Sequence, residues 1–262
     1  MSENAVSTGL FDAGRNCWRI ERAERAAFLI DADAYFKAFV AAARKAHRSI
    51  LITGWDFHSR TRLLCADERG RELELGRFLN DLVRRKRGLQ IHILIWDYPM
   101  IFGLDREWAP TYGFGWKPRR RIQFRYDNTH PVGASHHQKI VVIDDALAFC
   151  GGIDLTCKRW DTCDHAPNDA RRVVLGAPYP PFHDLMMAVD SDAAKSLEIS
   201  CASAGGVRRA KRLHLPMCAA RIRGPIHCSR RCGGICASRC RAARRRARTP
   251  RRSGRWRRFT SI

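Results

Sequence analysis

The sequence predicts an α/β fold, and three observations lead to that prediction. Short apolar runs rich in β-branched residues alternate with segments of helical periodicity through most of the chain. Hydrophobic residues make up 45% of the composition, which is enough for a buried core. No apolar run approaches the roughly 20 residues that a membrane-spanning helix needs. A globular domain in which strands and helices alternate follows from these features.

The first predicted elements are a helix and a strand. Apolar residues recur at helical spacing over residues 32–47, and Asp31 or Asp33 is available as an N-terminal cap. The short apolar run over residues 49–53 ends at Gly54 and predicts a strand. This helix is expected to pack on the sheet to which the strand belongs.

The next elements repeat this alternation. Residues 75–87 form an amphipathic pattern that ends near a glycine, which predicts a second helix, and residues 90–96 predict another buried strand. A loop rich in aromatic residues, proline and glycine is expected over residues 97–118. Residues 121–126 alternate as a strand does and lead into the segment that carries the chemistry.

That segment is Ser-His-His-Gln-Lys-Ile-Val-Val-Ile-Asp-Asp, residues 135–145. Side chains alternate between faces in an extended chain, so His137 and Lys139 project together at the start of a buried β-branched strand. Asp144 has the opposite parity and lies where the apolar run stops, so it is expected to brace a strand end or turn. His136 points away from His137 and is expected to be structural.

A histidine beside a lysine favours phosphodiester chemistry. A neutral imidazole such as His137 can attack phosphorus and form a covalent intermediate, while Lys139 places a positive charge on the non-bridging oxygens. Gly151 and Gly152 would let the backbone approach a bound phosphate, and with Asp154 they are the candidate substrate-binding residues. This chemistry requires no metal and no other cofactor. The carboxylate that orients the imidazole is left open among three downstream candidates, which are Asp154, Asp161 and Asp164.

The pattern His137-x-Lys139-x4-Asp144, followed by Gly151-Gly152-x-Asp154, resembles the HKD signature of the phospholipase D superfamily. Stretches at residues 155–161 and 180–190 are similar to segments of lipid-cleaving members, and residues 50–56 resemble the first core strand of the family. The resemblance covers roughly residues 14–194. It implies a mixed sheet flanked by helices, forming one of the enzyme's two halves. It also implies that the histidine is the nucleophile, the lysine binds phosphate and the aspartate supports the motif.

Family members carry two such motifs, whose histidines face each other; one attacks phosphorus and the other protonates the leaving alcohol. Among the ten histidines of this chain, only His137 has a lysine two residues later. The expected function is therefore that of a truncated phospholipase D-type enzyme, which hydrolyses phospholipids or transfers their phosphatidyl group through a phospho-histidine. One alternative is a single-motif nuclease or other phosphodiesterase that is active only as a homodimer. Another is an inactive half-domain with a basic binding tail.

The net charge of +22 belongs to the C-terminal part of the chain. Residues 1–194 contain 28 Lys and Arg against 25 Asp and Glu, which gives +3, whereas residues 195–262 contain 20 against 1, which gives +19. We therefore divide the chain into a leader (1–13), a catalytic half-domain (14–198) and an irregular basic tail (199–262). The tail, rich in arginine and cysteine, is interpreted as disordered or as an off-frame reading of a GC-rich gene. The functional alternative is a basic arm that binds nucleic acid or anionic lipid.

Cysteine spacing and the N-terminus bear on the expected location. Cys228, Cys232, Cys236 and Cys240 recur every fourth residue, a spacing that does not match the paired ligands of structural zinc sites. The other cysteines before the tail show no paired spacing, which suits a reducing compartment. The N-terminal residues show no signal-peptide pattern. We therefore expect a cytoplasmic protein, with peripheral contact to a membrane as the alternative site of action.

Overall fold

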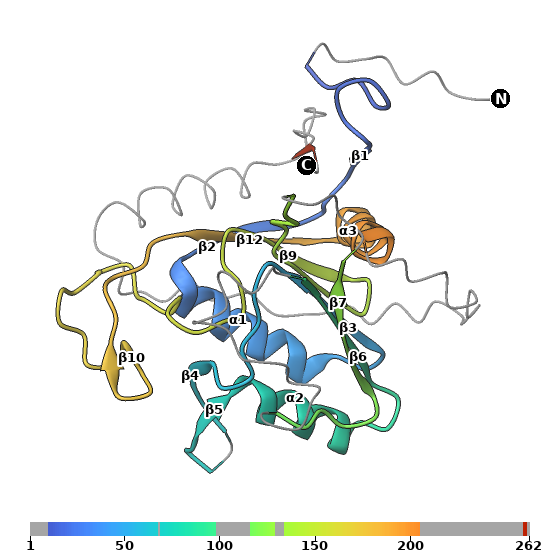
Figure 1. The fold of residues 1–262 in the computed structure, drawn as a ribbon. Coiled ribbons are helices and arrows are strands. Elements are labelled where there is room, and N and C mark those ends of the chain that lie inside the picture. The colour runs from blue at the N-terminus through green and yellow to red at the C-terminus, as the bar shows by residue number, and fades with distance from the viewer. Residues whose placement is uncertain (1–9, 68, 98–115, 129–133, 205–258, 261–262) are drawn as a thin grey trace, which may run out of the picture. The chain divides into compact units, whose positions relative to one another are not determined.

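A seven-stranded mixed sheet forms the centre of the structure, a computed structural model that describes residues 10–67, 69–97, 116–128, 134–204 and 259–260. Its strand order is β2, β12, β9, β8, β3, β6, β7 (Figure 1). Strands β3, β6 and β7 run parallel, and the other neighbours are antiparallel. The strands are β2 (Ala26–Ile30), β12 (Leu185–Asp190), β9 (Leu147–Gly151), β8 (Ile140–Ile143), β3 (Ser49–Gly54), β6 (Gln90–Trp96) and β7 (Ile122–Asp127).

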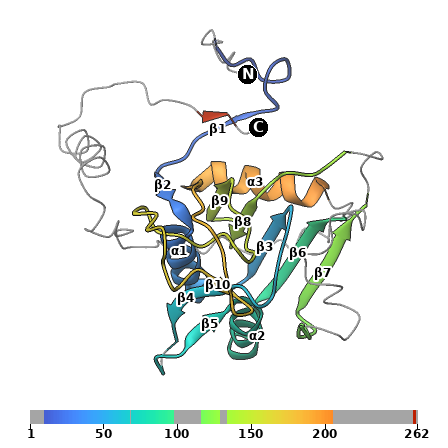
Figure 2. The same cartoon turned by 60° about the vertical axis from the view of Figure 1, so that its left-hand side comes forward.

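Three helices of the described residues pack on this sheet, so the predicted α/β class is confirmed. They are α1 (Asp31–Lys45), α2 (Leu75–Arg85) and α3 (Ser191–Ala204). Helices α1 and α2 lie on one face and α3 on the other, as Figure 2 shows. The four residues of β8 are all buried because alternate side chains face the two layers: Val141 and Ile143 join the α1 and α2 core, and Ile140 and Val142 face α3.

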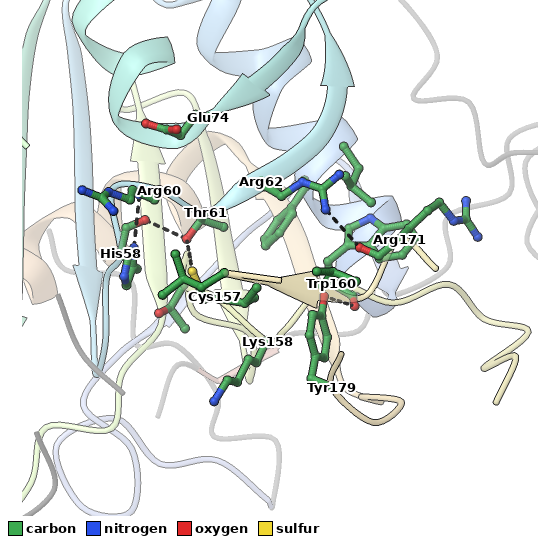
Figure 3. A pocket seen from close by; sticks show the side chains of 16 residues that line it. His58, Arg60, Thr61, Arg62, Glu74, Cys157, Lys158, Trp160, Arg171 and Tyr179 are labelled. Carbon is green, nitrogen blue, oxygen red and sulfur yellow. Dashed lines mark hydrogen bonds between the residues drawn. The ribbon is translucent and has the colours of Figure 1, made fainter. Parts of the chain in front are cut away.

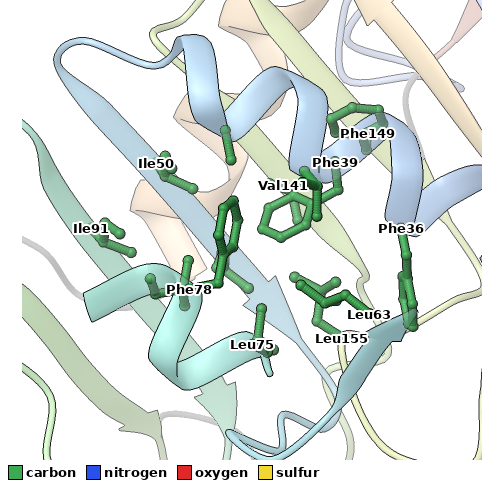
Figure 4. Packing of buried hydrophobic residues seen from close by; sticks show 14 of the residues in the cluster. Phe36, Phe39, Ile50, Leu63, Leu75, Phe78, Ile91, Val141, Phe149 and Leu155 are labelled. Carbon is green, nitrogen blue, oxygen red and sulfur yellow. The ribbon is translucent and has the colours of Figure 1, made fainter. Parts of the chain in front are cut away.

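Aromatic side chains fill the larger core (Figure 4). Phe36 and Phe39 of α1, Phe78 of α2 and Phe149 of β9 belong to this one cluster, and each of the four is at most 4% exposed. The ring centroids of Phe39 and Phe78 lie 6.2 Å apart in an edge arrangement. Burial of such a side chain stabilises the fold by about 1.5–3 kcal/mol. The helix periodicity of the sequence is therefore explained by this shared aromatic core.

The predicted capping of the first helix was wrong. The residue before α1 is Ile30, and no side chain caps the helix. Asp31 is its first residue, with a φ of 62°, and its carboxylate accepts a hydrogen bond from the main-chain N–H of Asp184 instead. Asp33 pairs with Lys37 one turn later. The start of α1 is thus set by long-range contacts rather than by a local cap.

Several elements had no clear sequence pattern. Strand β2 lies at one edge of the sheet and pairs with β12. Two short hairpins lie outside the sheet: β4 (Arg62–Ala66) with β5 (Glu72–Glu74), and β10 (Val173–Val174) with β11 (Ala177–Pro178). Helix α3 continues to Ala204, beyond the boundary predicted at residue 198. In the described part of the chain, no helix has the length and apolarity needed to cross a bilayer.

The chain divides into two compact units, residues 23–224 and residues 1–22 with 225–262. The sheet and its helices belong to the first unit. In the second, β1 (Ile20–Glu21) pairs antiparallel with β13 (Phe259–Thr260). Residues 205–258 of the predicted tail and residues 98–115 of the predicted aromatic loop lie outside the described residues.

Candidate active site

Two neighbouring strands bring the motif residues together. His137 and Lys139 lie in the segment that leads into β8, and Trp55 follows the end of β3, whose Thr53 pairs with Ile140. The rings of Trp55 and His137 meet edge to face, with centroids 6.1 Å apart, and Nζ of Lys139 lies 5.8 Å from the Trp55 ring. Trp55 also stacks on the tryptophan that ends β6. The residue after the end of β3 and the segment that enters β8 thus form one wall of the site.

Lys139 is buried and paired with Asp154. Only 6% of the lysine side chain and 2% of the aspartate side chain are exposed, and Nζ lies 3.1 Å from Oδ2. Burial raises the pKa of Asp154 to about 6, although the charge of Lys139 acts to lower it. The other oxygen, Oδ1, accepts a hydrogen bond of 2.9 Å from the main-chain N–H of Trp55. Asp154 was predicted to bind substrate. In the structure the carboxylate is buried, and its role is to hold Lys139 in place.

The ring of His137 is suited to act as a neutral nucleophile. Partial burial lowers its pKa below the ordinary value, and the charge of Lys139 lowers it further. The carboxylate of Asp184 acts in the opposite direction. The residue itself is exposed, so its ring is open to a substrate. At neutral pH the imidazole therefore carries a free lone pair beside a positive charge.

Sequence reasoning missed Asp184 as the carboxylate near His137. Of the three candidates, Asp154 is committed to Lys139, Asp161 pairs with Arg172, and Asp164 is exposed. A signal was present, since the aspartate lies in the stretch of residues 180–190 that resembles lipid-cleaving relatives. Its proximity arises from the pairing of β12 with β9, which sequence periodicity does not specify.

The two glycines at the end of β9 allow a close approach of the neighbouring strand. A Cβ atom at Gly152 would overlap the carboxylate of Asp184, and a Cβ at Gly151 would overlap the carbonyl oxygen of Leu185. The diglycine therefore lets β12 and its leading aspartate approach β9 closely. A contact of Gly151 and Gly152 with a bound phosphate stays a prediction.

Asp144 lies at the opposite end of β8, roughly 16 Å along the strand from Lys139. Its carboxylate accepts hydrogen bonds from the main-chain N–H groups of His47, Arg48 and Ser49, at 2.7, 2.7 and 2.9 Å. This agrees with the bracing role expected from its parity. His136 is likewise turned away from the site, with Nδ1 2.7 Å from Oδ2 of Asp127.

Replacing Asp144 with alanine is expected to lower the free energy of unfolding by about 2–4 kcal/mol, because three main-chain donors lose a charged acceptor. Its φ of 52° adds strain for alanine, whereas asparagine tolerates this conformation and keeps one acceptor. Urea unfolding should therefore rank Asp144→Asn between the wild type and Asp144→Ala. Any turnover, normalised to folded protein, should stay within about tenfold of the wild type. Lost turnover at unchanged stability would instead assign Asp144 to the chemistry.

A cavity of about 220 Å³ is shown in Figure 3, and none of His137, Lys139 and Asp154 is among the residues that line it. One lining residue, Thr156, donates a 2.7 Å hydrogen bond to Asp56, the residue after Trp55. Apolar and cationic side chains share its wall, among them Phe36, Leu64, Val174, Arg60, Arg62 and Lys158. The cavity therefore combines surfaces that suit an apolar chain and an anionic group.

No family model matches the chain. It is similar to Phospholipase D A of Dictyostelium discoideum, with 27% identity over 65% of this chain and 15% of that protein. It is also similar to human Phospholipase D1, with 27% identity over 58% of this chain and 14% of that protein. Phospholipase D zeta 1 of Arabidopsis thaliana is 29% identical over 55% of this chain and 13% of that protein. Each match covers more than half of this chain.

The chain belongs to the phospholipase D superfamily. The chain spans between 13% and 15% of the length of these relatives. Among solved structures it is similar to NucT from Helicobacter pylori, with 11% identity, a TM-score of 0.45, and coverage of 69% of this chain and 94% of that one. It is also similar to phosphatidylserine synthase of Haemophilus influenzae, with 18% identity, a TM-score of 0.43, and coverage of 69% and 36%.

Proposed function

We propose that this phospholipase D-family chain cleaves the phosphodiester bond of phospholipids, with His137 as the nucleophile. The observation that carries the proposal is the open imidazole with a lowered pKa beside the buried cation of Lys139. The cavity lined by Thr156 supports a lipid ligand, since apolar and cationic groups share its wall. The sequence similarity to phospholipases D supports the same substrate class.

In the proposed reaction, a ring nitrogen of His137 attacks phosphorus and the bond from phosphorus to the head-group alcohol breaks. A second imidazole gives a proton to the leaving alcohol. Water, or a primary alcohol, then attacks the phospho-histidine, loses its proton to that second imidazole and releases phosphatidic acid or a phosphatidyl alcohol. Lys139 stabilises the charge on the non-bridging oxygens throughout.

The second imidazole is proposed to come from His137 of another copy of this chain. The sequence holds one His-x-Lys pattern, so a single copy supplies one such histidine. A twofold axis would place two of them face to face. The partner in this proposal is thus a second copy, and the activity is a property of the dimer.

Mixing tests the pairing directly. Wild-type chain is unfolded and refolded with increasing amounts of His137→Asn, and turnover of phosphatidylcholine to phosphatidyl alcohol is measured at constant total protein. If two histidines form each site, turnover follows the square of the wild-type fraction. A linear dependence would overturn the pairing.

Substrate class is tested in the same preparation. Single-stranded DNA and a small aryl phosphodiester are assayed beside phosphatidylcholine vesicles. We expect phosphatidyl alcohol as the main product when a primary alcohol is present. DNA cleavage without lipid turnover would replace the phospholipase proposal with a nuclease, and absence of all turnover in a folded dimer would indicate an inactive half-domain.

A further inference from the structure

A buried carboxylate and two imidazoles meet at the start of α1, outside the proposed chemistry. Asp31 is the first residue of α1, His165 lies in the loop after β9, and His183 precedes β12. Nδ1 of His183 lies 2.8 Å from Oδ1 of Asp31, and Nε2 of His165 lies 3.4 Å from Oδ2. One potential ligand atom from each of the three residues lies within 4.8 Å of the other two.

The carboxylate of Asp31 is incompletely satisfied. The residue is 0% exposed, and Oδ2 accepts no hydrogen bond from the part of the chain that the structure describes. Its main chain is held at a φ of 62°, which is unfavourable for a residue with a side chain. A buried anionic oxygen without a donor is costly, so a cation or a proton is expected to lie beside it.

Asp161 prepares His165 to act as a metal ligand. Nδ1 of His165 lies 3.0 Å from Oδ2 of Asp161, and Arg172 donates a 2.9 Å hydrogen bond to Oδ1 of the same carboxylate. Because a carboxylate paired with arginine accepts hydrogen bonds, the proton of the neutral imidazole lies on Nδ1. The lone pair of Nε2 then faces Asp31. Such a carboxylate–histidine arrangement is the usual support of a metal-binding histidine.

The geometry points to a divalent cation site of the Zn²⁺ class formed by Asp31, His165 and His183. Ligand atoms around a tetrahedral zinc ion lie roughly 3.3 Å apart. The histidine nitrogens lie 2.8 and 3.4 Å from the two different oxygens of Asp31, and one ligand atom of each residue lies within 4.8 Å of the other two, so small side-chain shifts would complete the set. Two imidazoles and one carboxylate suit zinc and leave one position for water. The side chains of His165 and His183 are 31% and 67% exposed, so an ion can reach the buried oxygen.

The site is separate from the proposed reaction but lies close to one of its groups. The main-chain N–H of Asp184, whose carboxylate acts on His137, lies 3.2 Å from Oδ1 of Asp31. A bound ion would therefore fix the backbone that carries this carboxylate. The inference concerns binding and does not depend on the phosphodiesterase activity.

Metal binding by the full chain is tested with Co²⁺ as the probe. We expect one equivalent to give the weak visible bands of nitrogen and oxygen coordination. Cobalt held by the cysteines of the tail is recognised by intense sulfur-to-metal absorption in the near ultraviolet. His165→Asn and His183→Asn should each weaken the nitrogen-type site by at least about 100-fold, since even changes to outer residues of metal sites cost 10–100-fold.

Two controls separate the loss of a metal ligand from a loss of folding. His183 is largely exposed, so its replacement leaves no cavity, and circular dichroism reports whether each variant is folded. His47→Asn, at an exposed position, should bind cobalt as the wild type does. Histidine ring resonances followed during a Zn²⁺ titration should move for His165 and His183 and stay fixed for His47. Unchanged cobalt bands in both ligand variants, thiolate absorption alone, or a doubly protonated His165 that ignores zinc would overturn the site.

Discussion

Replacing His137 with asparagine is expected to lower phosphodiester turnover by roughly 10⁴-fold or more, because the attacking nitrogen is removed. The side chain is exposed and its described contact is with the Trp55 ring, so the free energy of unfolding should change by no more than about 0.5 kcal/mol. Turnover is measured on phosphatidylcholine, and stability by urea unfolding. A loss of turnover without a loss of stability is the signature of a reacting group.

His47→Asn is the matched control: it removes an exposed imidazole at the opposite end of β8 from His137, keeps the main-chain N–H that contacts Asp144, and should leave turnover unchanged. Substrate labelled in the phosphate should leave acid-labile label on wild-type protein and none on His137→Asn. Turnover that survives in His137→Asn, or label on another residue, would assign the nucleophile elsewhere. Activity of the wild type should fall on the acid side with an apparent pKa below 6.5, the ordinary value for histidine.

The second large effect is expected at the buried ion pair. Lys139→Met should lower the free energy of unfolding by about 3–5 kcal/mol at pH 7, because Asp154 is left buried without its cation. It should also remove turnover, since the charge beside the phosphate is lost. The double variant Lys139→Met/Asp154→Asn should recover most of the stability, because the introduced amide oxygen still accepts from the main-chain N–H of Trp55. Turnover should not return in the double variant.

The pH dependence follows from the raised pKa of Asp154. In the folded state this carboxyl binds a proton more readily than in the unfolded state, where its value is near 3.8. Proton binding by Asp154 therefore stabilises the folded state most at low pH, and this contribution is lost as the pH rises through the raised pKa of the folded state. The penalty of Lys139→Met should therefore be smaller at pH 5 than at pH 7. A penalty that is independent of pH would contradict a buried carboxylate at this position.

Lys37→Met provides the comparison for a surface pair. Lys37 contacts Asp33 one turn away at 2.7 Å, but its side chain is 54% exposed. Its replacement should change stability by no more than about 1 kcal/mol. An equally large loss at Lys37 would mean that burial does not explain the effect at Lys139.

Local pattern was sufficient for much of the fold. Apolar spacing at 3.6 residues predicted α1 and α2, and the β-branched run at residues 140–143 predicted β8. Side-chain parity placed His137 and Lys139 together and set Asp144 apart from them. These features depend on neighbours within a few residues, so the sequence alone carries them.

Contacts between distant segments decided the rest. The sequence left open which carboxylate accompanies His137, and only the pairing of β12 with β9 brings Asp184 there. The same pairing explains the diglycine as room for that carboxylate. Asp31 read locally as a helix cap, yet in the fold it faces two histidines more than 130 residues away. The sequence determined the chemical groups and their local spacing, whereas the strand register of the sheet determined which groups meet, because register joins residues whose separation along the chain carries no periodic signal.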